Sequence, residues 1–384
     1  MKILYVVSRW GEPTETFVRR EVAAGLAAGQ EISVLSLKKP IPVAGGPHVE
    51  HLSRWAVVVG AASFLLRHPR RASRVLRLLR GASRRNLPRH GYALALALAG
   101  HDRLSRPDWI HAHFAWLSAT TAWGLSTLFG APFGVMPHAH DIYEHELVDG
   151  LLRRKLAAAS VVVVESERIR ADVRTDHGRD PDVLRMGVPD DFVNAGRTHE
   201  GDGSHVVSVG ALRPKKGHDV LIEAVAGIEG VHLRIVGEGD ERSRLESLIG
   251  RLDVGERVTL VGHVAEDHII AELDAADVFA LASRVTAEGD RDGVPNVLIE
   301  AMARCLPVIS TEVAGIPDLL LPERGSVVAS NDAAALRGAL IELLRNPSLR
   351  NRRAEAARAH VRDQYTVGVN WQRLEQLLEA ALTS

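Results

Sequence analysis

The sequence predicts an α/β protein made of two Rossmann-like, doubly wound domains that face each other across a cleft. A length of 384 residues suits two domains of ordinary size. Short apolar runs typical of buried parallel strands alternate with helical patterns, and this alternation restarts after a polar, glycine-containing segment at residues 189–203. We therefore expect an N-terminal domain over residues 1–190, a second domain over residues 204–365, and a final helix over residues 366–384 that packs back on the first domain.

The composition is that of a soluble globular protein, with 46% apolar and 25% charged residues. The net charge of −1 is unevenly spread, because residues 1–190 carry 26 basic and 18 acidic side chains and the remainder carries 21 and 30. A basic N-terminal half suits an anionic partner such as a membrane surface. Cys305 is the only cysteine, the N-terminus does not resemble a signal peptide, and every apolar run is too short to span a bilayer. These features predict a cytoplasmic protein.

The first strand is expected at residues 2–8, followed by a loop, a helix over residues 16–28 and a second strand over residues 31–37. Ligands of doubly wound folds gather at the carboxyl ends of the strands, so the loop is a candidate acceptor or donor site. Its candidate residues are Gly11, Thr14, Glu15 and Thr16. A plain connection in which Thr14 or Glu15 caps the helix is the alternative.

Residues 56–89 contain nine arginines interleaved with apolar residues. At about 3.6 residues per turn this pattern predicts a basic helical stretch with apolar residues available for docking, as in segments that bind a membrane surface. A domain helix with a solvated arginine face is the structural alternative. Phe64 is the only aromatic residue of the stretch and it carries no known nucleic-acid motif, so nucleic acid is not an expected partner.

Histidines follow two further strands of the first half. A strand at residues 108–113 ends in His111 and His113, and a strand at residues 133–137 leads into the run HAHD at residues 138–141. His138 is the first candidate for the cleft, and His140 competes because alternate residues of a strand share a face. Asp141 is a further candidate. Two histidines and an aspartate also suggest a metal site, which we do not favour because no third well-spaced ligand group is evident.

In the second half, strands are expected at residues 205–209, 231–236, 257–261, 278–281 and 307–310, with helices between them and three helices from residue 332 to the end. Residues 286–303, TAEGDRDGVPNVLIEAMA, read as a loop that runs into a helix whose first residue is Pro295. A helix N-terminus suits a phosphate. Asp292 precedes it and Glu300 lies about one and a half turns inside, so at ~1.5 Å per residue the two carboxylates are separated by roughly the length of a diphosphate.

One of these acids could bind hydroxyls of a sugar and the other those of a ribose, which indicates a nucleotide-sugar site. The alternative is that Asp292 caps the helix and that Glu300 is a solvated helix acid. The spacing of a carboxylate, seven residues and a glutamate followed by Ala-Met-Ala resembles the donor-site signature of family 4 glycosyltransferases, which have the two-domain GT-B fold. The first acid is usually Glu in that family, so Asp292 is one methylene shorter.

The run GALRPKKG at residues 210–217 resembles the family's loop whose arginine and lysine clamp the donor diphosphate. Lys216 keeps the lysine, Ala211 occupies the arginine position, and Arg213 could supply the charge from a different backbone point. A basic surface turn is the alternative. Asp290 and Asp292 mimic the Asp-x-Asp metal motif of the other large glycosyltransferase fold, but their position before a helix favours a metal-free site.

The resemblance implies a retaining, metal-independent hexosyltransferase without a cofactor. It would move a sugar from a nucleoside-diphosphate sugar, preferably a UDP-sugar, to a hydroxyl of a glycan or lipid-linked acceptor. Residues 14–17 and 138–143 are most similar to bacterial exopolysaccharide glycosyltransferases. Three alternatives remain open: a small soluble natural-product acceptor, a nucleotide-sugar epimerase of the same fold, and a non-catalytic sugar-nucleotide-binding subunit.

The resemblance also implies a role for each matching residue. The catalytic residues are His138 and Asp292; Arg213, Lys216, Gly293, Val294 and Pro295 bind the diphosphate; Glu300 binds the ribose; Gly262, His263 and Val264 hold the nucleobase; and Gly237 lies in a supporting glycine-rich turn.

Overall fold

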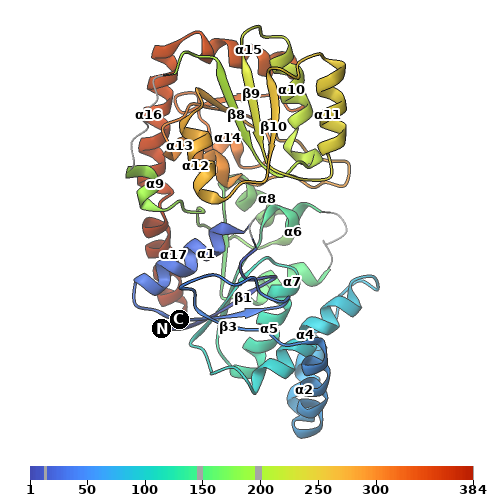
Figure 1. Ribbon diagram of the computed structural model, residues 1–384. Coiled ribbons are helices and arrows are strands. Elements are labelled where there is room, and N and C mark those ends of the chain that lie inside the picture. Colours follow the sequence, from blue (N-terminus) through green and yellow to red (C-terminus); the bar gives the residue numbers. More distant parts are fainter. Residues whose placement is uncertain (13–14, 145–149, 195–200, 384) are drawn as a thin grey trace. The chain divides into compact units, whose positions relative to one another are not determined.

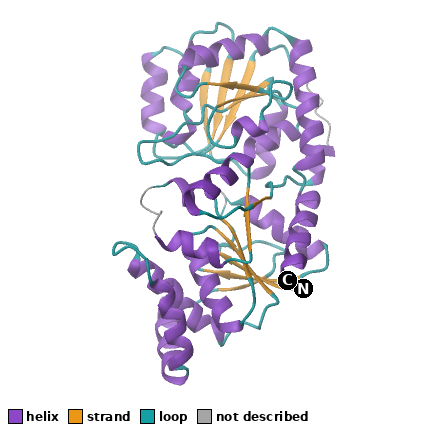
Figure 2. Ribbon diagram, turned by 180° about the vertical axis from the view of Figure 1, so that it is seen from behind, coloured by secondary structure: helices purple, strands orange, loops and turns teal. Residues whose placement is uncertain are grey.

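The computed structural model describes residues 1–12, 15–144, 150–194 and 201–383 (Figure 1). The chain divides into unit 1, which comprises Met1–Gly187 and Asn370–Ser384, and unit 2, Val188–Val369. Each unit contains one parallel sheet surrounded by helices (Figure 2). The prediction of two doubly wound α/β domains is therefore confirmed.

The seven strands of unit 1 lie in the order β3-β2-β1-β4-β5-β6-β7. They are β1 Lys2–Val7, β2 Glu31–Ser36, β3 His48–Glu50, β4 Trp109–His113, β5 Phe133–Met136, β6 Val161–Val164 and β7 Asp182–Val183. Strands β1 and β4 are neighbours, with Tyr5 opposite His111 in the register. Strand order reverses between β1 and β4, and the carboxyl ends of the strands at such a point bind ligands in α/β folds.

The helices of unit 1 include the predicted arginine-rich stretch, which is not one helix. They are α1 Thr16–Ala27, α2 Arg54–Arg67, α3 Pro69–Leu76, the 3-10 turn Arg77–Leu79, α4 Leu87–His101, α5 Leu117–Phe129, α6 Ala139–Tyr143, α7 Gly150–Ala158 and α8 Glu167–His177. The first break falls at His68, because Pro69 lacks an amide hydrogen and starts a new helix. Helices α2 and α4 pack side by side (Figure 1).

The last helix, α17 Val367–Thr383, begins in unit 2, and from Asn370 onward its residues belong to unit 1. Trp371, Leu374 and Leu378 are buried in the core of unit 1. Trp371 packs over Gly25, where an added Cβ would come within 2.5 Å of the indole. The C-terminal helix thus completes the first unit.

The sheet of unit 2 has the order β10-β9-β8-β11-β12-β13. The strands are β8 His205–Val209, β9 His232–Val236, β10 Val258–Gly262, β11 Val278–Ala280, β12 Val308–Thr311 and β13 Ser326–Val328. Its helices are α9 Asp190–Asn194, the 3-10 turn η2 Pro214–Lys216, α10 His218–Ala226, α11 Arg242–Arg251, α12 Glu266–Asp274, α13 Asn296–Ala303, α14 Ile316–Leu319, α15 Ala333–Leu344 and α16 Pro347–Gln364. Strand order reverses between β8 and β11.

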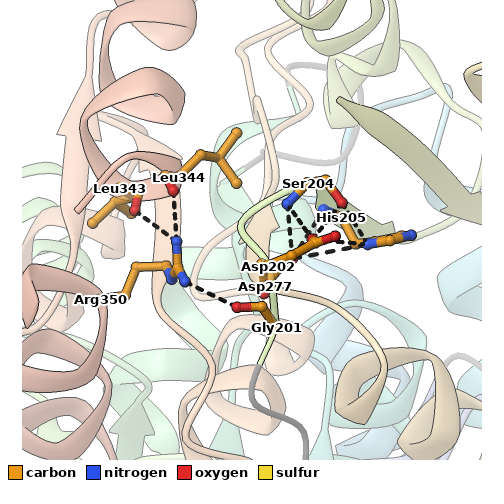
Figure 3. A network of polar contacts seen from close by, with 8 residues as sticks. All are labelled: Gly201, Asp202, Ser204, His205, Asp277, Leu343, Leu344 and Arg350. Atoms are coloured by element: carbon orange, nitrogen blue, oxygen red, sulfur yellow. Dashed lines mark hydrogen bonds and ion pairs between the residues drawn. The ribbon is translucent and has the colours of Figure 1, made fainter. Parts of the chain in front are cut away.

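A polar network fixes the start of unit 2's sheet (Figure 3). The carboxylate of Asp277, which precedes β11, accepts hydrogen bonds from the amides of Ser204 and His205 at 3.0 Å. Arg350 of α16 is buried and donates to the carbonyls of Leu344 at 2.6 Å and Gly201 at 3.3 Å. The Asp277 contacts thus hold the start of β8 beside the start of β11.

Candidate functional site

An ion pair lies where the loops after β8 and β11 meet. Lys216 Nζ lies 2.8 and 2.9 Å from the two carboxylate oxygens of Asp292. Ser283 Oγ donates to Asp292 Oδ2 at 2.8 Å. The side chains of Lys216 and Asp292 are only 14% and 9% exposed. The predicted lysine and the predicted acid are therefore brought together at the switch point of unit 2, where α/β folds bind ligands.

Asp292 is held in its ionised form. Burial alone would raise the pKa of its carboxyl group, but attraction to Lys216 and Lys215 and the hydrogen bonds from Lys216 and Ser283 outweigh burial. The pKa consequently lies below its ordinary value. The ionised acid and Lys216 thus face each other in largely buried surroundings.

The loop that carries Lys216 is fixed by side chains from the loop after β11. Arg284 Nε donates to the carbonyl of Pro214 at 2.6 Å, and its amide donates to the carbonyl of Lys215 at 2.8 Å. Lys215 Nζ pairs with Asp290 at 3.0 Å. Gly217 has a φ of +61°, and a Cβ there would lie 1.9 Å from the carbonyl oxygen of Ala282. The sequence reading missed Ser283 and Arg284, which belong to none of the motifs it used.

The glycine turn after β9 and the end of β10 lie against the same loop. Gly237 donates its amide hydrogen to the carbonyl of Gly262 at 2.9 Å, and a Cβ on Gly237 would lie 2.0 Å from the carbonyl oxygen of Gly210. Glycine is required by this close approach. His263 is exposed and Val264 is half-buried. Arg213, the predicted substitute for the missing arginine, is exposed.

Helix α13 begins one residue later than predicted. Pro295 has an extended ψ of 122° and is the N-cap residue, so Asn296 is the first helical residue. Gly293, Val294 and Pro295 are buried. Neither Asp292 nor any other described side chain caps α13, and Glu300 is buried at 9% exposure. The alternative of a capping Asp292 and a solvated Glu300 is therefore wrong.

The candidate histidines of unit 1 differ sharply in their surroundings. His138 is the buried N-cap of α6, where it forms a capping box with Asp141. Asp141 Oδ2 accepts from the amides of His138 at 3.0 Å and Ala115 at 2.8 Å. His140 is exposed and pairs with Glu144, the C-cap residue of α6. The expected shared strand face is wrong, because β5 ends at Met136 and His140 lies within α6.

The loop after β1 contains the other predicted residues. Gly11 has a φ of +82°, and a Cβ there would lie 2.4 Å from the carbonyl oxygen of Ile41. Thr14 lies outside the described residues. Glu15 is at the N-cap position of α1 without a side-chain capping bond, and Thr16 is the first helical residue. Burial raises the pKa of Glu15 to about 7, although attraction to His138 acts in the opposite direction.

Three side chains that the sequence reading did not combine lie together beneath His138. Ligand atoms of Glu21, His111 and His113 lie within 4.8 Å of one another, close enough to hold a cation. Glu21 Oε1 lies 3.0 Å from His113 Nε2, and it also accepts a hydrogen bond from Tyr5 Oη at 2.8 Å. Glu21 therefore already pairs with His113 and Tyr5, whereas neither ring nitrogen of the buried His111 has a hydrogen-bond partner among the described residues. Glu21 was missed because only the fold brings α1 beside β4.

Residues 193–360 match the family described as Glycosyl transferases group 1. The amylovoran biosynthesis glycosyltransferase AmsK of Erwinia amylovora is 34% identical over 203 residues, which cover 51% of this chain and 50% of that protein. A GDP-mannose-dependent phosphatidylinositol monomannoside mannosyltransferase of Corynebacterium glutamicum is 36% identical over 176 residues, 44% of this chain and 45% of that protein. The chain thus spans about half the length of the curated relatives it matches.

Among solved structures, the sucrose-phosphate synthase of Thermosynechococcus elongatus is similar with a TM-score of 0.77 at 21% identity, covering 100% of both chains. Anabaena HepE in complex with UDP and glucose is similar with a TM-score of 0.74 at 19% identity, covering 99% of this chain and 100% of that one. These likenesses show the fold, which is the two-domain GT-B fold expected from the resemblance.

Proposed function

We propose, on the premise that residues 193–360 belong to the family Glycosyl transferases group 1, that this chain is a retaining, metal-independent hexosyltransferase. It would move the sugar of a nucleoside-diphosphate sugar, preferably a UDP-sugar, to a hydroxyl of a glycan or lipid-linked acceptor. The structure of HepE with UDP supports a uridine donor. The name of AmsK, an amylovoran biosynthesis glycosyltransferase, supports a glycan product.

The observation that carries the proposal is the Lys216–Asp292 pair at the switch point of unit 2. A bound diphosphate would take over the Lys216 ammonium group, with Arg213 as a second cation and the backbone amides of Gly293 and Val294 as donors. Pro295 has no amide hydrogen, so it would contribute by setting the start of α13 beside the phosphates. Asp292 would then be free to bind hydroxyls of the transferred sugar. Glu300, eight residues further on, would bind the ribose.

Each acid of the Asp-x-Asp run has its own lysine, because Lys215 pairs with Asp290 and Lys216 with Asp292. Two carboxylates that are already neutralised by ammonium groups do not need a divalent cation to balance their charge. This pairing supports a donor site in which lysines, rather than a metal ion, offset the charge of the leaving diphosphate. Gly262, His263 and Val264 would hold the nucleobase, largely through the backbone.

In unit 1, the proposed reaction uses His138 beside the transferred sugar, where a histidine stabilises an oxocarbenium-like state. The pKa of His138 is raised: burial lowers it, but a hydrogen bond to Glu165 and the charges of Glu165, Asp141 and Glu15 outweigh burial. Gly11, Glu15 and Thr16, with Thr14, would form the acceptor or donor loop. His140 and Asp141 would act indirectly, without contacting the sugar. Asp141 would do so by holding the start of α6.

The proposal includes an anionic membrane surface as a partner of residues 56–89. One face of α2 exposes apolar side chains at helical spacing: Trp55 is 75% exposed, Val58 59% and Leu66 84%. Arg70, Arg74 and Arg77 are exposed on the adjoining α3 and the turn after it. An exposed apolar stripe beside a basic cluster suits the interface of an anionic bilayer. We propose a peripheral position on the inner face of the cell membrane.

No helix in the part of the chain that the structure describes is long and apolar enough to cross a membrane. Flotation with vesicles that contain an anionic lipid tests the surface. Arg70→Glu/Arg74→Glu/Arg77→Glu and Trp55→Ser/Leu66→Ser should each reduce co-flotation. Arg71 stays intact because it donates to the carbonyl of Leu128 at 2.5 Å. Charge reversal at three exposed arginines of unit 2, Arg251, Arg345 and Arg352, is the matched control and should leave flotation unchanged.

The donor is tested first by thermal shift with UDP-, GDP- and ADP-sugars, since a ligand that binds only the folded chain raises its melting temperature. UDP-sugars should give the largest rise. Transfer is then measured with the selected donor and candidate acceptors. Epimerisation of the donor sugar without acceptor would favour the epimerase, and donor binding without any turnover would favour the non-catalytic subunit. A chain that binds none of the nucleotides would overturn the proposal.

A further inference from the structure

A series of polar contacts runs through the buried interior of unit 1 and ends at His138. Tyr5 Oη donates to Glu21 Oε1 at 2.8 Å, and His113 Nε2 lies 3.0 Å from the same oxygen. His113 Nδ1 lies 3.3 Å from His138 Nε2. His138 Nδ1 lies 3.6 Å from Glu165 Oε2. Tyr5, His113, His138 and Glu165 are all buried, so water cannot substitute freely for these partners.

The proton positions follow from the carboxylate of Glu21. Burial raises the pKa of Glu21, but His113, His111 and the hydrogen bond from Tyr5 lower it to about 2. An ionised carboxylate can only accept. Burial and the neighbouring Glu21 raise the pKa of Tyr5 well above its ordinary value, so its hydroxyl keeps the proton and donates. His113 must therefore present Nε2–H to Glu21, and in the neutral ring Nδ1 is left as an acceptor.

The facing nitrogens of His113 and His138 share a single proton. Because His113 Nδ1 is the acceptor, the proton belongs to Nε2 of His138. We propose that Glu21 and His113 are positioning residues, which hold the proton of His138 on Nε2 and leave Nδ1 as its titrating nitrogen. Nδ1 faces Glu165 Oε2 at 3.6 Å, at the start of α6, where the amide of Asp141 donates to the carbonyl of His138 at 2.9 Å. The sequence motifs assign no such role to Glu21 or His113.

Protonation of Nδ1 would turn it from an acceptor into a donor. It would then point its hydrogen at the carboxylate of Glu165, which lies 3.6 Å away. The carboxylates of Glu165, Asp141 and Glu15 and the ring of His113 face His138, and the three acids favour the charged form. The charge of His138 is thereby coupled to its contact with Glu165. The catalytic consequence rests on the role proposed above for His138, whereas the proton position does not.

The test is the tautomer of His138 in the full chain labelled with ¹⁵N-histidine. Two-bond ¹H–¹⁵N correlation spectra distinguish Nδ1–H from Nε2–H, and the signals lost in His138→Asn identify the ring. In the native chain, neutral His138 should show Nε2–H. Glu21→Met removes the acceptor that orients His113, so the two nitrogen shifts of His138 should exchange as the proton moves to Nδ1, toward Glu165. Glu31→Met, at an exposed acid of the same unit, should change nothing.

His113→Phe is the second variant, for use if Glu21→Met does not fold, and should produce the same exchange. An Nδ1–H signal in the native chain, or an unchanged tautomer in both variants, would overturn the proposal. So would displacement of the His113 signals by one equivalent of zinc, because Glu21 and His113 would then bind a cation instead. The spectra need no donor, so a chain that transfers no sugar but keeps the Nε2–H form counts against the proposed function alone.

Activity provides a readout that a merely structural role would not change. If His138 acts in transfer, its pH–kcat profile should shift in Tyr5→Phe, which removes one bond to Glu21 while leaving the Glu21–His113 contact. The dissociation constant of the free nucleoside diphosphate should stay the same, because the residues proposed to bind its phosphates, ribose and base all lie in unit 2. A uniform loss of kcat at every pH, without a shift of the profile, would contradict control of His138 by this series of contacts.

Discussion

Removing Lys216 should destabilise unit 2 mainly through the charge that it leaves behind on Asp292. The two side chains are 14% and 9% exposed, so Asp292 cannot replace its lost partner fully with water. Deleting one member of such a buried pair typically costs about 3–5 kcal/mol, whereas replacing both members by neutral groups is often close to neutral. Lys216→Met should therefore be strongly destabilising, and Lys216→Met/Asp292→Asn should recover most of the loss.

A loss of about 3 kcal/mol corresponds to a fall in melting temperature of about 6–12 °C for a unit of this size, at roughly 2–4 °C per kcal/mol. The two units can be followed separately. All tryptophans lie in unit 1: Trp10, Trp55, Trp109, Trp116, Trp123 and Trp371. Tryptophan fluorescence thus reports unit 1, whereas far-UV circular dichroism reports both. The circular dichroism transition should move in Lys216→Met while the fluorescence transition stays in place.

Lys215→Met is the matched control, because Lys215 also pairs with an aspartate but both partners are more exposed, at 22% and 26%. A pair of this kind contributes only about 0–1 kcal/mol. Equal destabilisation by both substitutions, or no recovery in the double variant, would refute the reasoning.

The pH dependence gives a second check on the same reasoning. The pKa of Asp292 is lowered in the folded chain. The ionised carboxylate therefore adds to the free energy of unfolding above the ordinary pKa of an aspartate, and this stabilisation is lost as pH falls through the pKa of the folded state. Without Lys216, burial should raise that pKa, so the ionised acid becomes a cost as pH rises above about 4. The deficit of Lys216→Met should be largest at neutral pH and should shrink toward pH 4. A deficit that is independent of pH would show that Asp292 is not its cause.

Three further outcomes are expected. Glu300→Gln should abolish the thermal shift caused by UDP, because the proposed ribose contact is lost, with little change in the melting temperature of the free chain; a retained UDP shift would remove Glu300 from the site. Trp55→Ser/Leu66→Ser should reduce vesicle flotation without changing transfer to a soluble acceptor, and equal flotation would remove α2 from the membrane surface. Glu15 has a raised pKa of about 7, so its ionisation lowers the stability of unit 1 as pH rises from about 4.5 to 7. Glu15→Gln should remove that decline, whereas Glu31→Gln should retain it.

The sequence predicted the sheets well because parallel strands are buried on both faces and therefore read as continuous apolar runs. The predicted helix boundaries agree less closely with those of the structure. Residues 56–89 have one continuous basic pattern, yet His68 and Pro69 divide them, and the exposed face of α2 begins at Trp55, just outside the predicted stretch. The apolar residues expected to dock are partly those that pack inward, such as Phe64 and Val75. Only the folded structure shows which face of α2 is covered by its neighbour α4.

For the candidate site, too, residues within local motifs were predicted and residues that depend on contacts between distant segments were not. Lys216 and Asp292 were expected in one site because each belongs to a motif with fixed local spacing, and the structure brings them together. The place of Glu300 in that site stays a prediction. Ser283, Arg284 and Glu21 were not found, because their significance depends on contacts between segments far apart in the chain or outside any motif. His138 and His140 are two residues apart and were expected to share a face, but the strand ends before them and the change to helix buries one and exposes the other.

The sequence did not predict that the two lysines and the two aspartates of the site pair with one another. In the sequence alone, Asp290 and Asp292 suggest a site for a metal cation. Lys215 and Lys216 suggest a site for a phosphate. In the folded chain each lysine lies within 3.0 Å of its own aspartate, so the four charges offset one another. A diphosphate must compete with carboxylates for these lysines, and the energy of the pairs is subtracted from the affinity of the donor. In the proposed function, the bound diphosphate replaces Asp292 as the partner of Lys216. Asp292 can therefore bind the hydroxyls of the sugar only when the diphosphate is bound.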